Sequence, residues 1–274
     1  MKDREENNLF TESALPDGLV TDTAAGQIGV VPMKWTRGEQ LYSGKAKSIY
    51  ATHDDEFVIM EFKDDATAFN GVKHALIGDK GRINCAITVH IFEQLARQGV
   101  PSHMVEQLSE TDLLCHRVEI VPVEVVVRNV IAGSLAKRYG KKEGDRLETP
   151  MLEYFYKSDE LNDPLMTEDH AIRFGWAKKW ELECMCEQAL AINTLLVDFW
   201  GEMNVDLVDF KLEFGRHKGR IVLADEITPD GSRLWERGTM KRFDKDVFRR
   251  DLGDLSTTYR QLYERIFGEG LKDA

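Results

Sequence analysis

Three charged side chains stand at alternating positions in one short segment. Residues 208–215 read VDFKLEFG, in which Asp209, Lys211 and Glu213 alternate with large apolar side chains. Because the side chains of a strand alternate between its two faces, the apolar ones can enter a core while the three charges share the opposite face. A half-solvated edge strand of an antiparallel sheet has the same pattern, so this segment alone does not establish a chemical role.

A second acidic strand follows. After GRHKG comes RIVLADEI, and the two segments predict an antiparallel hairpin. One register places Asp209 opposite Asp225, and a shift of two residues places Glu213 there instead; the sequence does not choose between them. Carboxylates that meet across strands raise each other's pKa unless a cation intervenes. Two interpretations stay open, a magnesium site with hard oxygen ligands or surface salt bridges to Lys211 and Arg233.

Three other segments carry side chains that suit phosphate. The turn TPDGSR delivers Arg233, whose planar guanidinium can hold a phosphate, just beyond the acidic strand. The segment VVVRNVIAGSLAKRYG predicts a buried strand ending at Arg128 and a short helix near Ser134, which suits either a phosphate or an ordinary helix cap. In YSGKAKS, Lys45 and Lys47 are expected to share a face of an early strand, although a lone Gly-Lys pair is a weak signal.

A mixed fold of helices and strands must position these side chains. Apolar residues at three- and four-residue spacing predict helices, and β-rich segments bounded by turn residues predict strands. Helices are expected at 83–98, at 176–203 and as two segments within 243–267 broken near Gly253, and strands at 40–63, 113–121 and 123–127. We expect an α+β protein with an extension at 1–34, a β-rich lobe at 35–121 and a larger α+β lobe at 122–274.

The composition restricts the environment and the partners. The 36 Lys and Arg residues against 48 Asp and Glu residues give a net charge of -12, which argues against a general electrostatic grip on nucleic acid or anionic membrane. Four irregularly spaced cysteines favour a reducing compartment. The sequence has no apolar segment long enough to cross a membrane and no secretory signal at its first residues. We therefore expect a soluble, cytoplasmic protein.

In chain order, five segments resemble the signature segments of the SAICAR (phosphoribosylaminoimidazole-succinocarboxamide) synthetases. They are LYSGKAKSIY, PVEVVVRNVIAGSLAKRYG, DPLMTEDH, VDFKLEFG and LADEITPDGSRLW. The resemblance implies a two-lobed fold with a small β-rich ATP-binding lobe, a larger α+β lobe and the active-site cleft between them. It also implies an ATP-dependent ligase of de novo purine biosynthesis that joins L-aspartate to carboxyaminoimidazole ribotide (CAIR) and releases ADP and phosphate.

The resemblance further implies roles for individual residues. Those expected to contact ATP are Gly44, Lys45, Ala46 and Lys47 at the phosphates and the chain from Glu119 to Val121 at the adenine. Magnesium is expected at Glu213 and Asp225, with Asp209 and Lys211 close by. The residues expected to bind the ribotide are Glu124, Arg128, Ser134 and Arg233, and those expected near aspartate are Asp65, Asn70 and Lys80. Lys211, Asp209 and Lys45 are expected to serve the chemical step.

The chemistry suits these residue types. A carboxylate is a poor electrophile, so we expect it to attack the γ-phosphate of ATP and form an acyl phosphate that the aspartate amine displaces. The group that takes the proton from this amine is not visible in the sequence. We expect only small molecules as partners (ATP, CAIR and L-aspartate), no nucleic acid or membrane, and a homo-oligomer, in the simplest case a dimer, although the sequence does not give the oligomeric state.

Two alternatives from other classes use the same fold. A nucleotide-binding regulatory protein would have lost a metal carboxylate or a phosphate-binding side chain, and none of the matched positions is lost here. A small-molecule kinase could use the same lysines and carboxylates, but it does not explain a second phosphate site.

Overall fold

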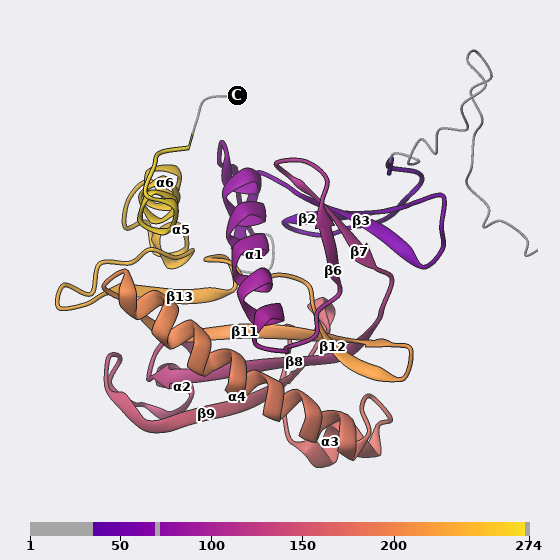
Figure 1. Cartoon of the computed structure of the whole chain (residues 1–274). Coiled ribbons are helices and arrows are strands. Elements are labelled where there is room, and N and C mark those ends of the chain that lie inside the picture. Colours follow the sequence, from indigo (N-terminus) through magenta and orange to yellow (C-terminus); the bar gives the residue numbers. More distant parts are fainter. Residues whose placement is uncertain (1–34, 69–71, 272–274) are drawn as a thin grey trace, which may run out of the picture. The chain divides into compact units, whose positions relative to one another are not determined.

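The computed structural model describes residues 35–68 and 72–271. The chain divides into two units, Met1–Thr36 and Arg37–Ala274, and the second contains all the helices and strands described below (Figure 1). The extension expected at 1–34 and the candidate residue Asn70 lie outside the described residues.

A five-stranded antiparallel sheet is built from the first strands of the second unit. Its order is β1-β2-β3-β7-β6, with β1 at Gln40–Ser43, β2 at Lys47–Ala51, β3 at Phe57–Phe62, β6 at Met104–Gln107 and β7 at Asp112–His116. The strands expected between residues 40 and 63 are confirmed, and β2 and β3 pair as an antiparallel hairpin. The early strand expected to hold both Lys45 and Lys47 divides into β1 and β2 at a turn that contains Lys45. The prediction that Lys45 and Lys47 share a strand face is therefore wrong.

A six-stranded antiparallel sheet holds the predicted acidic strand. Its order is β10-β9-β8-β11-β12, and β13 also pairs with β11. The strands are β8 at Glu119–Val130, β9 at Arg146–Tyr156, β10 at Leu165–Met166, β11 at Val205–His217, β12 at Arg220–Ala224 and β13 at Ser232–Glu236. Strand β11 has partners on both sides, β8 on one and β12 and β13 on the other, so it is a central strand and not an edge strand.

The hairpin of β11 and β12 has neither of the two expected registers. Its turn consists of Lys218 and Gly219, whose φ values of 46° and 78° are those of a two-residue type I′ turn. This turn places Glu213 opposite Ala224, one residue short of Asp225. Asp225 follows the end of β12 with a φ of 60°. The register is thus one residue away from the arrangement in which Glu213 faces Asp225.

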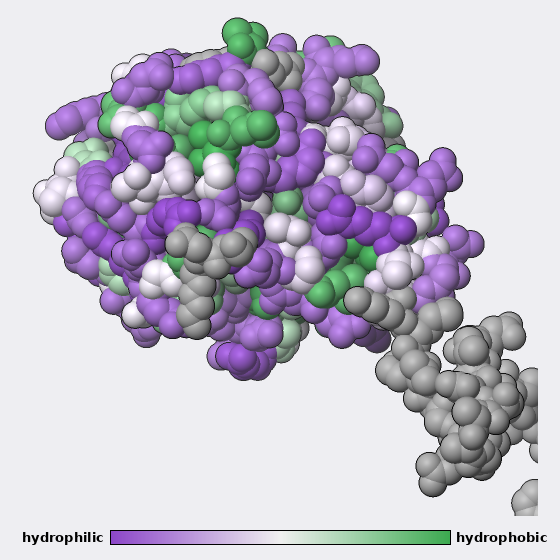
Figure 2. All heavy atoms as spheres, turned by 90° about the horizontal axis from the view of Figure 1, so that it is seen from above, coloured by the Kyte–Doolittle hydropathy of each residue, from purple (hydrophilic) through white to green (hydrophobic). Residues whose placement is uncertain are grey.

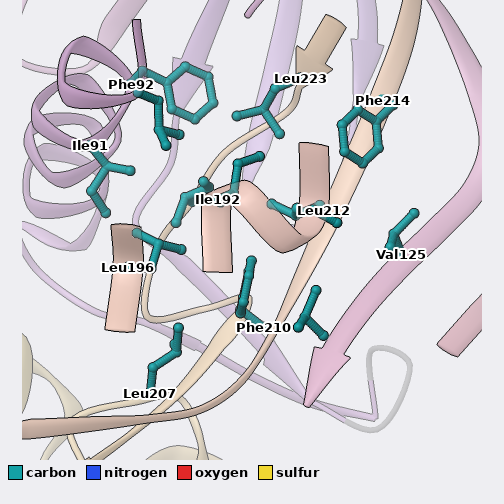
Figure 3. Packing of buried hydrophobic residues seen from close by; sticks show 14 of the residues in the cluster. Ile91, Phe92, Val125, Ile192, Leu196, Leu207, Phe210, Leu212, Phe214 and Leu223 are labelled. Carbon is teal, nitrogen blue, oxygen red and sulfur yellow. The ribbon is translucent and has the colours of Figure 1, made fainter. Parts of the chain in front are cut away.

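The apolar face of β11 belongs to the main core. Phe210, Leu212 and Phe214 are buried in one cluster with Ile192 and Leu196 of helix α4, Lys179–Glu202 (Figure 3). Burial of each such side chain contributes about 1.5–3 kcal/mol. The three charges of β11 lie on its other face, so the alternation predicted from the sequence is confirmed.

The remaining helices complete the second unit. They are α1 at Lys80–Arg97, α2 at Gly133–Tyr139, the 3-10 helix η1 at Asp159–Leu161, α3 at Glu168–Arg173, α5 at Asp246–Arg249 and α6 at Leu255–Phe267. Helix α1 packs against β3 and α6. A two-stranded sheet, β4 at Asp65–Ala68 and β5 at Lys73–Leu76, precedes α1. The helices predicted at 83–98, at 176–203 and on both sides of Gly253 are confirmed within a few residues.

Figure 2 shows the molecule of Figure 1 from above. Hydrophilic side chains cover most of this face, and apolar side chains gather in a few areas between them. Within the described ranges, none of the helices has the length and apolar character needed to cross a membrane. The division into lobes at residue 121 stays a prediction.

Candidate active site

A cleft of about 670 Å³ brings together side chains from both large sheets. Its walls are the turn between β1 and β2, the connection from β7 to β8, the loop after β9, the middle of β11 and the segment 225–231. A second cavity of about 550 Å³ lies among α2, β9 and β10 and is lined mainly by apolar side chains. None of the site residues predicted from the sequence lines this second cavity, so the cleft is the candidate active site.

Lysines and carboxylates alternate along the floor of the cleft. Lys211 Nζ donates to Glu213 Oε1 at 2.6 Å and to Glu124 Oε1 at 2.9 Å, and Lys157 Nζ donates to the same Glu213 oxygen at 2.9 Å. Burial alone would raise the pKa of the Glu213 carboxyl, but the ammonium groups of Lys211 and Lys157 hold it well below its usual range. Burial raises the pKa of Glu124. The floor therefore holds Glu213 ionised among fixed cations.

A second acidic group lies beside this floor. Lys47 forms ion pairs with Asp225 and, at 3.0 Å, with Glu226. Burial would lower the pKa of Lys47, but these two carboxylates raise it above its usual value. Glu226 Oε2 is buried and has no hydrogen-bond partner in the described structure, and burial raises the pKa of this carboxyl. One lysine thus faces two carboxyl groups, and one oxygen of Glu226 next to Asp225 is left without a hydrogen-bond partner.

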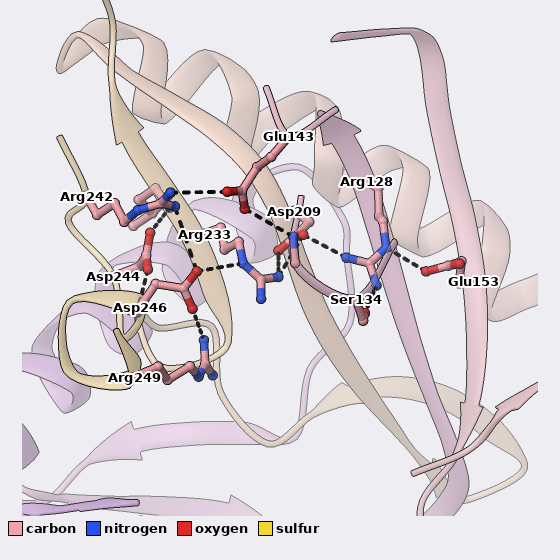
Figure 4. A network of polar contacts seen from close by, with 12 residues as sticks. Arg128, Ser134, Glu143, Glu153, Asp209, Arg233, Arg242, Asp244, Asp246 and Arg249 are labelled. Carbon is pink, nitrogen blue, oxygen red and sulfur yellow. Dashed lines mark hydrogen bonds and ion pairs between the residues drawn. The ribbon is translucent and has the colours of Figure 1, made fainter. Parts of the chain in front are cut away.

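The arginines predicted to bind phosphate meet at Asp209 (Figure 4). Arg128 Nη1 donates to Asp209 Oδ2 at 2.7 Å, and Arg233 Nη1 donates to the same oxygen at 2.9 Å. Arg128 Nη2 also donates to Ser134 Oγ at 3.0 Å. The predicted set of Arg128, Ser134 and Arg233 is therefore brought together.

The position of Asp209 corrects one expectation. Asp209 was expected beside the magnesium carboxylates, but it lies four residues before Glu213 on the extended strand β11, a separation of about 13 Å. Strand pairing places Arg128 on one side of Asp209 and Arg233 on the other. Asp209 therefore aligns the two arginines and does not take part in the acidic floor around Glu213.

Further partners fix the orientation of both guanidinium groups. Glu153 accepts from Arg128 Nε at 2.5 Å, and Asp246 accepts from Arg233 Nε at 3.1 Å. Gly133 has a φ of 53°, and a Cβ at this position would collide with Arg233 Nη2. This glycine is therefore needed both for its backbone conformation and for the close approach of the arginine. Glu153 and Asp246 were not predicted, because no spacing in the sequence relates them to the arginines.

Glu119 and Val121 of the predicted adenine segment do not line the cleft, but Ile120 between them does. Val121 is fully buried and the Glu119 side chain forms an ion pair outside the cleft wall, whereas Ile120 and Val118 line the cleft. A Cβ on Gly215 would collide with Val118, so this glycine lets the connection from β7 pack closely onto β11. The strand continues past Gly215 to His217.

Two of the three residues expected near aspartate, Asp65 and Lys80, do not line the cleft. Asp65 pairs with His74 at 2.8 Å inside the two-stranded sheet, and this contact above all lowers the pKa of Asp65. The Lys80 side chain is fully buried and pairs with Asp230 at 2.8 Å. The geometry therefore does not favour a contact of either residue with aspartate, and Asn70 lies outside the described residues.

Several residues that line the cleft were missed. Lys157 and Asp159 lie in the loop after β9, where Asp159 accepts from Lys45 Nζ at 2.6 Å. His103 lies against the backbone oxygen of Asp225 at 3.1 Å. Only Glu226 had a visible signal, because it directly follows Asp225 in the acidic strand. The others come from loops whose contacts depend on tertiary packing.

Arg128 and Arg233 do not line the cleft, and their partner Asp209 lies about 13 Å from Glu213 along β11. A cleft lined by lysines and carboxylates, with an aligned arginine pair farther along the same strand, has the parts of a phosphoryl-transferring enzyme. The model of the family described as SAICAR synthetase matches residues 40–266. The chain therefore belongs to the SAICAR synthetase family.

Relatives and solved structures agree with this assignment. The phosphoribosylaminoimidazole-succinocarboxamide synthase of Magnetococcus marinus is 50% identical over 233 residues, 84% of this chain and 96% of that protein. The enzyme of the same name from Chlorobium phaeobacteroides is 52% identical over 228 residues, 83% and 97% of the two chains. The fold is similar to that of a SAICAR synthetase (Type-2) solved in complex with ADP, with a TM-score of 0.82, 45% identity and coverage of 85% and 99%. The α+β fold expected from the resemblance is confirmed.

Proposed function

We propose that the cleft is the active site in which this chain carries out the reaction of its family. The chain is an ATP-dependent ligase of purine biosynthesis that joins L-aspartate to CAIR and forms SAICAR, ADP and phosphate. The proposal rests above all on two cationic groups on one face of β11, one around Glu213 and one around Asp209, about 13 Å apart. A ligase that holds ATP and a ribotide together needs two such groups.

The nucleotide is assigned to the first group. Lys45, Lys47 and the turn that contains Gly44 and Ala46 form one rim of the cleft and would hold the phosphates of ATP. Ile120, in the middle of the predicted adenine segment, supplies an apolar surface to the same cleft.

Magnesium is assigned to Glu213 and Asp225. In the described residues no three His, Cys, Asp or Glu side chains form a metal cage. Magnesium often binds through only one or two carboxylates and completes its shell with water and substrate phosphates, so the pair fits. The buried oxygen of Glu226 beside Asp225 has no hydrogen-bond partner, and a cation bound at this point would provide one. When bound, the ion would neutralise charge on the transferring phosphoryl oxygens.

The ribotide phosphate is assigned to Arg128, Ser134 and Arg233, and Glu124 would face the rest of the ribotide. The CAIR carboxylate then attacks the γ-phosphorus of ATP, and Lys45, Lys47 and Lys211 offset the charge that gathers there. The acyl phosphate formed is attacked by the amine of L-aspartate, and phosphate leaves.

The proposal also includes the cellular compartment and the oligomeric state. The four cysteines are free thiols, which supports the reducing cytoplasm as the compartment. A homodimer stays a prediction, and light scattering of the purified chain would test it.

Release of ADP tests the proposed function. We expect it to require both CAIR and L-aspartate and to yield a succinyl-linked amide that mass spectrometry detects. ADP release that depends on CAIR and ignores aspartate would contradict the ligase and favour the kinase.

A further inference from the structure

Lys245 lies on the cleft wall just before helix α5, in a segment that is held from three directions. Asp244 Oδ2 accepts a backbone hydrogen bond from β13 at 2.8 Å, and the Lys245 amide donates to the Pro229 carbonyl at 3.2 Å. Asp246 Oδ2 accepts from Arg233 Nε at 3.1 Å. The Lys245 residue is 7% exposed and lines the cleft. The backbone at Lys245 is thus fixed relative to the arginine that is assigned to the ribotide phosphate.

One carboxylate serves two lysines at this place. Asp230 Oδ2 is 2.8 Å from Lys80 Nζ and 3.4 Å from Lys245 Nζ, while Asp230 Oδ1 accepts from the Tyr259 hydroxyl at 2.6 Å. A single carboxylate compensates one ammonium group, and a second buried ammonium beside it is costly. Lys80 is closer, is fully buried and also has the Lys63 carbonyl at 3.4 Å. Asp230 therefore compensates the charge of Lys80 first, and Lys245 has the longer and weaker ion pair of the two.

The other charges around Lys245 come from three elements. Burial, above all, lowers the pKa of its ammonium group. Asp230 and Glu226 in the segment 225–231 oppose this shift, while Lys80 of α1 and Arg249 of α5 add to it. Helix α6 contributes the Tyr259 hydroxyl, which donates to Asp230. This environment makes the ammonium group of Lys245 easier to deprotonate than a lysine in water, and the side chain lines the cleft.

We propose that Lys245 is the general base that takes a proton from the α-ammonium group of L-aspartate. This inference rests on the proposed function, because an ammonium group has no lone pair with which to attack an acyl phosphate. The Lys245 Nζ lone pair forms a new N–H bond as an N–H bond of the substrate breaks. The freed amine forms the C–N bond, and the C–O bond to phosphate breaks, so that phosphate leaves with the electron pair. The leaving phosphate takes the second proton from the new amide nitrogen.

Two variants test this role. Lys245→Met removes the base and keeps an uncharged side chain of similar length, and Lys245→Arg keeps a side chain of similar length that cannot accept a proton at neutral pH. We expect both to lower kcat with aspartate by roughly 10²- to 10⁴-fold. Circular dichroism of both variants guards against an effect of misfolding. Lys241→Met is the matched control, because Lys241 is an exposed lysine four residues earlier that bonds Gln261, and it should keep wild-type activity.

A second nucleophile separates base catalysis from a structural role. Hydroxylamine is uncharged at neutral pH and needs no base before it attacks. With CAIR, ATP and hydroxylamine, both Lys245 variants should release ADP within about threefold of the wild-type rate. The residual turnover of Lys245→Met with aspartate should rise about tenfold per pH unit between pH 7 and 9, since the free amine must then come from solution.

The outcomes separate this inference from the proposed function. Lys245→Arg within tenfold of wild type with aspartate overturns the inference, because arginine is not a base. Equal losses with aspartate and hydroxylamine also overturn it and indicate a structural role. A wild-type chain that releases no ADP with CAIR and aspartate overturns the proposed function itself.

Discussion

Asp209 and Arg128 stand opposite each other on β11 and β8, and the Asp209 carboxylate accepts from Arg128 Nη1 at 2.7 Å. On the other side of the same strand, Arg233 of β13 is the pairing partner of Asp209 and donates to it at 2.9 Å. One buried carboxylate therefore aligns two guanidinium groups from two strands. The strand register alone brings these three side chains together.

We expect Asp209→Asn to weaken ribotide binding selectively. The variant keeps the shape of the side chain but removes the charge that orients both arginines. Hydrogen bonds to charged groups contribute about 1.5–3 kcal/mol, so KM for CAIR should rise about 10- to 100-fold. KM for ATP should stay within about twofold, which initial rates with each substrate varied in turn would measure.

Asp206→Asn is the matched control for this change. Asp206 lies three residues earlier on β11 and also bonds two arginines, Arg146 and Arg237, neither of which is assigned to the ribotide phosphate. A similar rise of both KM values in Asp209→Asn would contradict a separate phosphate site at the arginines.

A comparison of alanine variants at Gly133 and Gly140 distinguishes backbone strain from a collision with Arg233. Both have positive φ values, 53° and 61°, but a Cβ meets Arg233 only at Gly133 and meets nothing within 4 Å at Gly140. Each change to alanine should cost about 1–2 kcal/mol of unfolding free energy for the left-handed conformation. Only Gly133→Ala should also raise KM for CAIR. Thermal melts and kinetics of the pair would measure this, and an equal effect of both variants on KM would argue against the collision.

Asp225→Asn should abolish turnover and leave the fold intact. The change removes one of the two carboxylates assigned to magnesium, and the loss in kcat should be about 10³-fold or more at fixed magnesium concentration. Circular dichroism would check the fold, and a magnesium titration would show whether excess ion restores part of the activity. An unimpaired variant would remove Asp225 from the metal site.

The sequence predicted the strands and helices of the site better than it predicted which side chains meet. Alternation correctly placed Asp209 and Glu213 on one face of a strand, but four residues of extended chain separate them into two groups. Whether a side chain joins one group or the other depends on its cross-strand neighbours, Arg128 for Asp209 and Glu124 for Glu213. Pairing register is a tertiary property that a single strand does not encode.

Glycines show a second limit of sequence-based prediction. Gly215 indicates a strand end, a bulge or a close approach, and these possibilities have the same sequence signal. The structure shows a close approach, since Val118 occupies the space of a Cβ, together with a register irregularity between Glu213 and Gly215 in the pairing with β8. The turn falls at Lys218 and Gly219 instead. Lys245 gave no signal at all, because its environment arises from α1, α5 and the segment 225–231 only after folding.

The low pKa of buried His103 predicts that the folded protein loses stability in acid. Burial, above all, lowers its pKa to about 4, and its ring nitrogen Nε2 donates to the Asp225 carbonyl at 3.1 Å. The unfolded chain has a histidine pKa of about 6.5, so between pH 6.5 and 4 the unfolded state binds more protons than the folded state. The contribution of neutral His103 to the free energy of unfolding is therefore complete above pH 6.5 and is lost as the pH falls toward 4. A shift of this size corresponds to about 3 kcal/mol over the whole interval.

His103→Gln tests this assignment, because glutamine can donate to the same carbonyl but does not titrate. Urea unfolding at several pH values between 4.5 and 8 should show a smaller fall of unfolding free energy in acid for this variant than for the wild type. His53→Gln, in an exposed turn, serves as the control and should follow the wild-type curve. Above pH 7 the variant should be no more stable than the wild type, since the neutral ring already fills this site. An identical acid dependence in His103→Gln and the wild type would mean that other buried groups, such as the carboxylates of the cleft, govern acid unfolding.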